Sequence, residues 1–410
     1  MRRSLVFVLA AVGLVGVLPA QGPVMVPDLT LGTLEIEPRL YYMDRTFKAT
    51  DTVQESLAAG GRLFYETPWI YGFGLGLAGY TSQGLLFTSE RRGGSGLLRP
   101  DQSGYSVLGE AYLQARLSRV LARVYRQKIE SPLINSYDCK MTPVTVEAAT
   151  LCVDEITNLT ILASHVWGIK PWTDTAFSSP SDLAGATGTN RPVTLGGVTV
   201  KPGKDYVFQV WEHYAWDMMN VLYGQADATW RIRDNLSFLA SAQGMHQRDV
   251  GDALLGEFNT GMAGVMGGVD WYGLVLTAGY TTTANNHDMV NPWASYPAYT
   301  SLMEEDCNYA GQKAWMVGLA YDFSPLGAKG LSAFANHSQS YVPEGGDFTS
   351  PDQYEYNATV DYRLPGRLDG LWLRLRAAYV HKDDELPGGD YSDYRAILNY
   401  RFAAFRLSGS

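Results

Sequence analysis

Arg374 and Arg376 stand two residues apart in the stretch GLWLRLRAAYVH, residues 370–381 of this 410-residue chain. Leucines lie between and around them, so a β-strand would place the leucines on one face and both guanidinium groups on the other. A guanidinium keeps its charge at any relevant pH and can bind a carboxylate through two parallel hydrogen bonds. The spacing therefore predicts a pair of cations that could bind an anion.

The environment of the two arginines limits their role. Facing lipid in the middle of a membrane, each would cost about 2–4 kcal/mol. In a dry interior each would need a partner of opposite charge. A water-filled pore accepts both at little cost, and a passing anion would relieve their mutual repulsion. The alternative is that they pair with pore carboxylates such as Glu35, Glu37, Glu110 or Glu147 and only brace the wall.

Segments that alternate with period two run through the whole chain and could supply such a wall. Residues 34–45, 69–80, 106–117 and 394–402 place apolar and aromatic side chains at alternate positions, with glycine or polar residues between them. Alternation alone does not exclude a soluble β-sandwich. A transmembrane β-barrel is favoured because the apolar faces often begin or end in Tyr, Trp or Phe, as an aromatic girdle requires. Charged residues in the middle of the opposite faces suit a watery lumen.

The length of the chain fits one large antiparallel β-barrel. Tight connections such as WRIRDN, residues 230–235, alternate with long irregular ones, as short turns and long loops do in outer-membrane barrels. About 390 mature residues, at about 22 per strand and connection, give roughly sixteen to eighteen strands. No break in composition marks a second domain, so we expect residues 21–410 to form a single all-β barrel domain.

The N-terminus carries the pattern of a secretory signal peptide. Arg2 and Arg3 precede the apolar run SLVFVLAAVGLVGVL, and Ala20 ends a plausible cleavage site. We therefore expect residues 1–20 to direct export. The whole chain has 32 Lys and Arg against 42 Asp and Glu, a net charge of −10, which disfavours nucleic acid as a partner.

Catalysis, metal binding and cofactor binding lack sequence signals. The six histidines are scattered along the chain, and no G-x-S-x-G nucleophile motif occurs. The acidic stretches do not have the spacing of a calcium loop, and nothing resembles a zinc arrangement. We expect a protein that is not an enzyme and that holds neither a cofactor nor a metal.

Several stretches, taken in order, resemble the OprD family of outer-membrane porins. LEIEPRLYYMDR, residues 34–45, resembles the family's first strand, which has an Arg, two Tyr and a second Arg. ESPLINSYDCKMTP, residues 130–143, is similar to the start of the third loop. EDCNYAGQKAWMVGLAYDFSPLGAKGL, residues 305–331, and LWLRLRAAYVH, residues 371–381, resemble two later stretches.

The resemblance implies an 18-stranded transmembrane antiparallel barrel with an inward-folded third loop, placed in the outer membrane among lipid and lipopolysaccharide. It also implies facilitated diffusion of small hydrophilic solutes, typically anions with a carboxylate, along a ladder of basic side chains. Such a barrel would work singly or as a homotrimer. The alternatives are an unselective porin and a structural or adhesive surface barrel. The ladder would consist of Arg39, Arg45, Arg123, Lys140, Arg374, Arg376 and Arg395.

The resemblance further implies an acidic group and a hydroxyl group at the constriction, opposite the basic ladder. In this chain they would be Asp306 and Ser301. Asp306 follows Glu304 and Glu305, and three carboxylates in a row more often lie on a solvated loop. The constriction role of Asp306 and the solvated loop therefore remain open alternatives.

The chain departs from the family pattern in its cysteines and in its C-terminus. The family is poor in cysteine, whereas Cys139 and Cys152 would lie in the third loop and Cys307 in the seventh. Because the export route is oxidising, Cys139 could pair with Cys152 or with Cys307, or all three could remain thiols. Five residues, RLSGS, follow Phe405, although outer-membrane barrels commonly end on an aromatic residue.

Overall fold

The computed structural model describes residues 30–293, 295–341, 352–383, 389–402 and 405–408, so the predicted signal peptide lies outside the described range. Most of the described chain is β-strand, and none of its helices is long and apolar enough to cross a membrane. The strands are β1 (Thr30–Phe47), β2 (Thr52–Glu66), β3 (Phe73–Leu86), β4 (Tyr105–Leu117), β5 (Val120–Gln127), β6 (Thr145–Val153), β7 (Leu159–Lys170), β8 (Val193–Val200), β9 (Tyr206–Ala215), β10 (Met219–Arg233), β11 (Leu236–Asp249), β12 (Asn259–Trp271), β13 (Leu274–Thr283), β14 (Lys313–Asp322), β15 (Leu331–Tyr341), β16 (Gln353–Arg363), β17 (Leu371–Lys382), β18 (Tyr391–Tyr400) and β19 (Phe405–Ser408). The short helical segments are η2 (Glu90–Arg92), α1 (Pro180–Leu183), η3 (Ser324–Leu326) and η4 (Gly366–Leu368).

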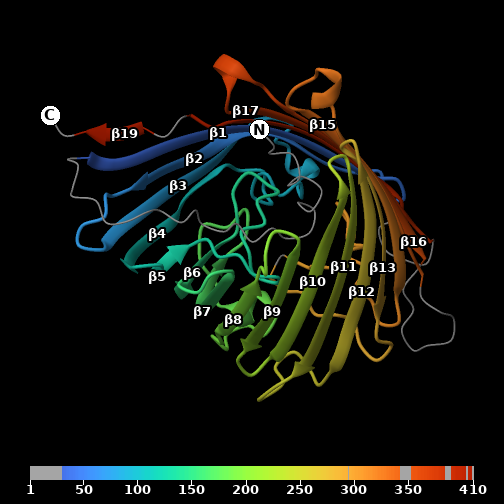
Figure 1. The fold of residues 1–410 in the computed structure, drawn as a ribbon, viewed down its shortest axis with the longest axis horizontal. Helices are drawn as coiled ribbons and strands as arrows, with labels where there is room; N and C mark the ends of the chain where they lie inside the picture. The colour runs from blue at the N-terminus through green and yellow to red at the C-terminus, as the bar shows by residue number, and fades with distance from the viewer. Residues whose placement is uncertain (1–29, 294, 342–351, 384–388, 403–404, 409–410) are drawn as a thin grey trace.

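The strands β1 to β18 form a closed antiparallel barrel, which confirms the predicted fold (Figure 1). Each strand pairs with its neighbours along the chain, and β1 also pairs with β18 from Arg39 opposite Asn399 to Phe47 opposite Tyr391. The fragment β19 continues the line of β18 along β1, since Phe405 lies opposite Leu34. The described part of the tail after Phe405 therefore prolongs the closing strand.

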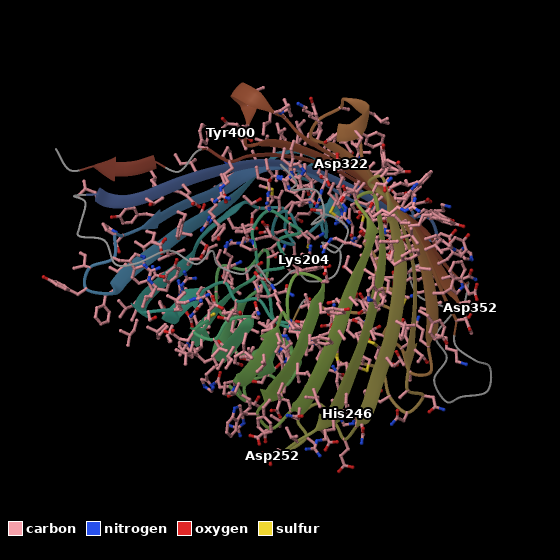
Figure 2. All side chains as sticks on the ribbon, viewed as in Figure 1. Lys204, His246, Asp252, Asp322, Asp352 and Tyr400 are labelled. Atoms are coloured by element: carbon pink, nitrogen blue, oxygen red, sulfur yellow. The ribbon has the colours of Figure 1, made fainter. Side chains whose placement is uncertain are left out.

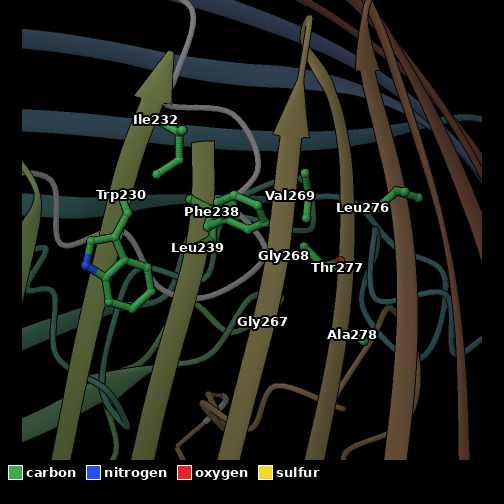
Figure 3. A pocket seen from close by; sticks show the side chains of 10 residues that line it. All are labelled: Trp230, Ile232, Phe238, Leu239, Gly267, Gly268, Val269, Leu276, Thr277 and Ala278. Carbon is green, nitrogen blue, oxygen red and sulfur yellow. The ribbon is translucent and has the colours of Figure 1, made fainter. Parts of the chain in front are cut away.

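Alternation along each strand separates an apolar outer face from an inner face. On β3, Phe73, Leu75 and Leu77 are exposed, whereas the two glycines between them and the alanine that follows Leu77 are buried. A shallow apolar hollow lies on the outer wall where Gly267 has no side chain between Trp230, Phe238 and Leu276 (Figure 3). Such a surface fits contact with lipid.

The connections have different lengths at the two ends of the barrel. One end has tight turns, such as residues 118–119, 234–235 and 272–273. The other end has the long loops L2 (residues 87–104), L3 (128–144), L4 (171–192) and L7 (284–312), together with the shorter L6 (250–258). Asp252 of L6 and His246 mark the loop end in Figure 2, and Asp322 marks the turn end. This alternation was predicted from the sequence.

The loops fold back between the walls. In L3, Asp138 contacts Arg39 of β1, and Ser131 Oγ lies 3.0 Å from His213 Nε2 of β9. Because β1 and β9 lie on opposite sides of an 18-stranded barrel, L3 crosses the lumen (Figure 1). L2 also turns inward, since Leu97 packs in a buried cluster with Tyr41 of β1. The loops therefore narrow the space through which a solute could pass.

Candidate solute pathway in the barrel lumen

Strand register brings five of the seven predicted ladder residues onto one wall. On this wall Arg376 of β17 lies directly opposite Arg395 of β18, and Arg374 lies one row further toward the turn end. β18 in turn pairs with β1, where Arg395 is opposite Met43. Residues opposite each other on antiparallel strands point to the same face. The five residues on the β1–β18–β17 wall are Arg39, Arg45, Arg374, Arg376 and Arg395.

Lys140 joins this wall from L3, and Arg123 does not. The Lys140 ammonium donates a hydrogen bond to the carbonyl of Ser95 (2.9 Å) and lies 3.6 Å from the sulfur of Met43. Arg123 belongs to β5, where its guanidinium donates to Gln114 Oε1 (3.0 Å) and lies over the ring of Tyr112. Arg123 is therefore separated from the basic wall by three strands, and the predicted ladder is not one continuous row.

Two of the wall arginines are neutralised by carboxylates of their own surroundings. Arg374 binds both oxygens of Asp361, at 2.7 and 2.9 Å, across the register of β17 and β16. Arg39 binds Asp138 of L3 in the same two-pronged way, at 2.6 and 3.0 Å. Such forked pairs fix geometry as well as charge. Arg374 and Arg39 therefore brace the wall and L3.

Glu304 of L7 occupies the space between two further arginines. Its carboxylate contacts the guanidinium groups of both Arg45 and Arg395, and its side chain is only 3% exposed. Asp393 of β18 completes the cluster, with its oxygens 3.1 Å from Arg45 Nε and 2.7 Å from Arg395 Nε. Burial raises the pKa of Glu304 to about 7, against the lowering effect of the neighbouring cations. Glu304 was not among the predicted site residues.

The carboxylates that the sequence suggested as partners of Arg374 and Arg376 form ion pairs with other basic residues. Arg62 of β2 contacts Glu35, Glu37 and Glu110 at 3.2, 3.5 and 3.2 Å. Glu147 pairs with Arg126 at 3.0 Å. The bracing interpretation thus holds for several wall arginines, but the expected partners were wrong because partner choice follows strand register.

Arg376 has a different environment from its neighbours. Its guanidinium donates a hydrogen bond to Thr359 Oγ1 (3.2 Å), and no carboxylate within the described residues pairs with it. Burial raises the pKa of the Tyr137 hydroxyl in L3, and the charges of Arg376 and Arg395 act to lower it. Tyr137 packs against Trp172 of L4, with ring centroids 5.6 Å apart and ring planes inclined by 46°. Arg376 is therefore a wall cation that no carboxylate of the described residues neutralises, and L3 carries an aromatic group within reach of its charge.

Asp306 and Ser301 both belong to L7. Asp306 is exposed and accepts a hydrogen bond from Asn291 Nδ2 (3.3 Å). Loop atoms surround Asp306 within the lumen although part of its surface meets water, and this partial desolvation together with the nearby Glu305 carboxylate raises the pKa of Asp306 to about 6. The Ser301 hydroxyl is buried within the loop. The constriction role of these two residues stays a prediction.

The cysteines depart from the expected disulfide. All three are free thiols, and Cys152 lies on β6 opposite Leu121 rather than in the third loop. Cys139 does lie in L3, where its carbonyl accepts a hydrogen bond from Tyr41 of β1 (3.0 Å). Cys307 is buried in L7 against Thr300. Cys139 and Cys152 thus belong to different parts of the barrel, which contradicts the proposed pairing.

The two groups that sequence reasoning missed are Glu304 and Tyr137. The run Glu304-Glu305-Asp306 did signal an acidic feature, but the alternation rule that orients side chains on a strand does not apply to a loop. Tyr137 lies within the stretch that resembles the third loop, three residues before Lys140. The path of each loop decides which side chain reaches the lumen.

Comparisons with known proteins agree with this architecture. The model of the family described as outer membrane porin, OprD family, matches residues 31–404. The structure of OccK9 (OpdG) from Pseudomonas aeruginosa is similar, with a TM-score of 0.81 and 22% identity over 91% of this chain and 98% of that one. OccAB3 from Acinetobacter baumannii gives a TM-score of 0.83 and 18% identity over 91% and 99%. OpdK from Pseudomonas aeruginosa, solved with vanillate, gives 0.79 and 16% over 91% and 99%.

A comparison with curated proteins gives no match. The family match spans nearly the whole described barrel, and the solved structures share its fold over nine-tenths of the chain. The chain therefore belongs to the OprD family and is a β-barrel porin of the outer membrane.

Proposed function

We propose that this porin favours small hydrophilic anions, carboxylates in particular, and that Arg376 and Lys140 are the groups that bind them during passage. The observation that carries the proposal is the contrast along one wall. Arg39, Arg45, Arg374 and Arg395 each contact a carboxylate, whereas Arg376 and Lys140 pair with none among the described residues. These two cations supply positive charge that the wall itself does not cancel.

The arrangement of Arg376 and Lys140 suits transient binding of a solute rather than tight binding. Arg376 projects from the rigid wall, and Lys140 reaches the same wall from the inward loop L3. Conduction requires binding that is strong enough for entry and weak enough for release, spread over more than one site. Burial and the charge of Arg395 lower the pKa of Lys140 to about 8, so this ammonium remains largely charged at neutral pH.

Aromatic carboxylates are suitable probes. Tyr137 of L3 and Trp172 of L4 pack against each other in the loops that turn inward, and aromatic side chains offer a flat apolar surface to a ring. The solved structure of OpdK with vanillate concerns a relative that is 16% identical, and it motivates only the choice of probe. Benzoate combines the carboxylate with the smallest aromatic ring.

The experiment compares flux of benzoate and of neutral arabinose into proteoliposomes for the wild type, Arg376→Gln and the double variant Arg374→Gln/Asp361→Asn. The Arg376 change should lower benzoate flux about fivefold, since one unit charge 4 Å away has about that effect in water. Arabinose flux should stay the same. The double variant removes a neutral pair and should keep benzoate flux while lowering the heat stability of the barrel. Equal losses for both solutes in R376Q would contradict the proposal.

An unselective porin is the second candidate, and one observation favours it. Four of the wall arginines are tied to carboxylates, so most of the predicted ladder is electrically neutral. Under this reading, R376Q and the wild type would pass benzoate and arabinose in the same ratio. We also propose that residues 1–20 are a signal peptide and that residues 21–410 are the mature barrel domain.

A further inference from the structure

We propose that Glu304 is an internal anion of the pore: L7 places its carboxylate on the paired arginines Arg45 and Arg395, where it competes with carboxylate solutes and limits how strongly the pore binds them. The inference rests on the proposed anion preference. The contacts that carry it are those of Glu304 with both guanidinium groups, which leave the Glu304 side chain 3% exposed. A solute carboxylate at this position would make the same kind of contact.

The groups around Glu304 come from four elements. Arg45 belongs to β1, and Arg395 and Asp393 belong to β18. Lys140 of L3 acts on Glu304 electrostatically, and Arg376 acts on Arg395. With Asp393 and Glu304 ionised, four cations face two anions. Neutralising Glu304 leaves four cations facing one anion, so this single loop carboxylate has a large effect on the charge of the wall.

The loop that carries Glu304 is docked onto the wall by a separate set of contacts. The Glu355 carboxylate of β16 accepts hydrogen bonds from the backbone N–H groups of Met303 (2.9 Å), Glu304 (3.1 Å) and Glu305 (3.1 Å). The Glu305 side chain contacts Lys382 Nζ (2.7 Å) and the hydroxyl of Tyr391 (2.5 Å). L7 therefore remains attached to the wall without the Glu304 side chain, and that side chain is free to act as a competitor.

A carboxylate solute that reaches Arg395 has to displace or repel Glu304. Arg376 is directly opposite Arg395 on the neighbouring strand, so a solute bound at Arg376 already lies close to this site. Removing the Glu304 charge should therefore extend the anion site from Arg376 to Arg395 and Arg45. The expected consequence is tighter binding of carboxylates and a stronger preference for anions.

The test uses single channels of the full protein in planar bilayers at pH 8, where the Glu304 carboxyl is mostly ionised. Glu304→Gln keeps the size and polarity of the side chain and removes its charge. Benzoate should block the current of Glu304→Gln with an affinity at least about fivefold higher than that of the wild type. Glu304→Asp keeps the charge, and Glu257→Gln makes the same chemical change on the exposed loop L6, so both should resemble the wild type.

Unchanged or weaker benzoate block in Glu304→Gln, with a barrel that is still folded by heat-dependent gel mobility, would overturn the inference. An equal rise in arabinose flux would also overturn it, because it would mean that the loop has moved away and widened the pore. The proposed function fails separately: a wild type that does not prefer anions contradicts that proposal, whatever Glu304→Gln does.

Discussion

At the scale of single residues, the pore wall combines fixed ion pairs with a few groups whose charge is open to change. The Arg374–Asp361 pair was not readable from the sequence, because it depends on the register that places Asp361 opposite Arg374. The placement of both arginines on a lumen face was readable, since the leucines between them fix the outer face. The sequence thus predicted the direction in which the cations point, but it did not predict which of them are neutralised.

Three loop groups predict how selectivity depends on pH. Asp306 titrates near pH 6 and Glu304 near pH 7, both raised mainly by burial, while Lys140 titrates near pH 8, lowered by burial. Each group gains a proton as the pH falls. The two carboxylates then lose their negative charge, and the Lys140 amine gains a positive charge. The anion preference should rise steadily between pH 9 and pH 5, as measured by reversal potentials in a salt gradient.

Matched variants separate the three contributions. Each variant should flatten the plot of anion preference against pH in a different range. Asp306→Asn should flatten it below about pH 6.5, Glu304→Gln should flatten it near pH 7, and Lys140→Gln should flatten it above about pH 7.5. A wild-type anion preference that increases with pH would have the wrong sign for all three groups. A profile that all three variants leave intact would assign the pH dependence to other residues.

At the scale of elements, the inward loops narrow the lumen of the barrel. L3 and L7 contact each other through Asn135 and Ser295, whose side chains are 2.7 Å apart, and both contact the basic wall. Sequence alternation and chain length indicated sixteen to eighteen strands, their faces and the long and short connections, and the family resemblance implied the eighteen that the barrel has. Alternation carries no information on how a long loop folds back, and so Glu304 was missed and Cys152 was assigned to a loop.

The docking of L7 should depend on Glu355. Its carboxylate accepts hydrogen bonds from three consecutive backbone N–H groups, and hydrogen bonds to a charged acceptor contribute about 1.5–3 kcal/mol each. Glu355→Gln removes the charge and one acceptor oxygen, so the amides of residues 303–305 should exchange hydrogen at least about tenfold faster, which corresponds to about 1.4 kcal/mol. Exchange measured by mass spectrometry tests this.

Two comparisons make the L7 result specific. Amides in the middle of β11, which four strands separate from β16, should keep their exchange rates in Glu355→Gln. Glu212→Gln, which alters a carboxylate that binds Asn220 on the β9–β10 wall, should leave L7 unaffected. If the amides of residues 303–305 exchange as slowly in Glu355→Gln as in the wild type, L7 is held by other contacts.

At the scale of the whole molecule, the basic wall coincides with the seam that closes the barrel. β1 and β18 pair there, and the Arg45–Asp393 contact joins the first and last strands of the closed barrel. The net charge of −10 is therefore no guide to the pore, because local fields follow the residues that line it. A preference for anions requires that the positive charge at the seam outweigh the acidic surroundings.

The reversal potential of single channels in a tenfold gradient of KCl tests that requirement most directly. The wild type should show a reversal potential of the sign that marks preference for chloride, and Arg376→Gln should shift it toward the potassium side by an amount equivalent to about a fivefold change in the permeability ratio. A wild-type channel that prefers potassium, or an Arg376→Gln channel with the same reversal potential as the wild type, would contradict the account.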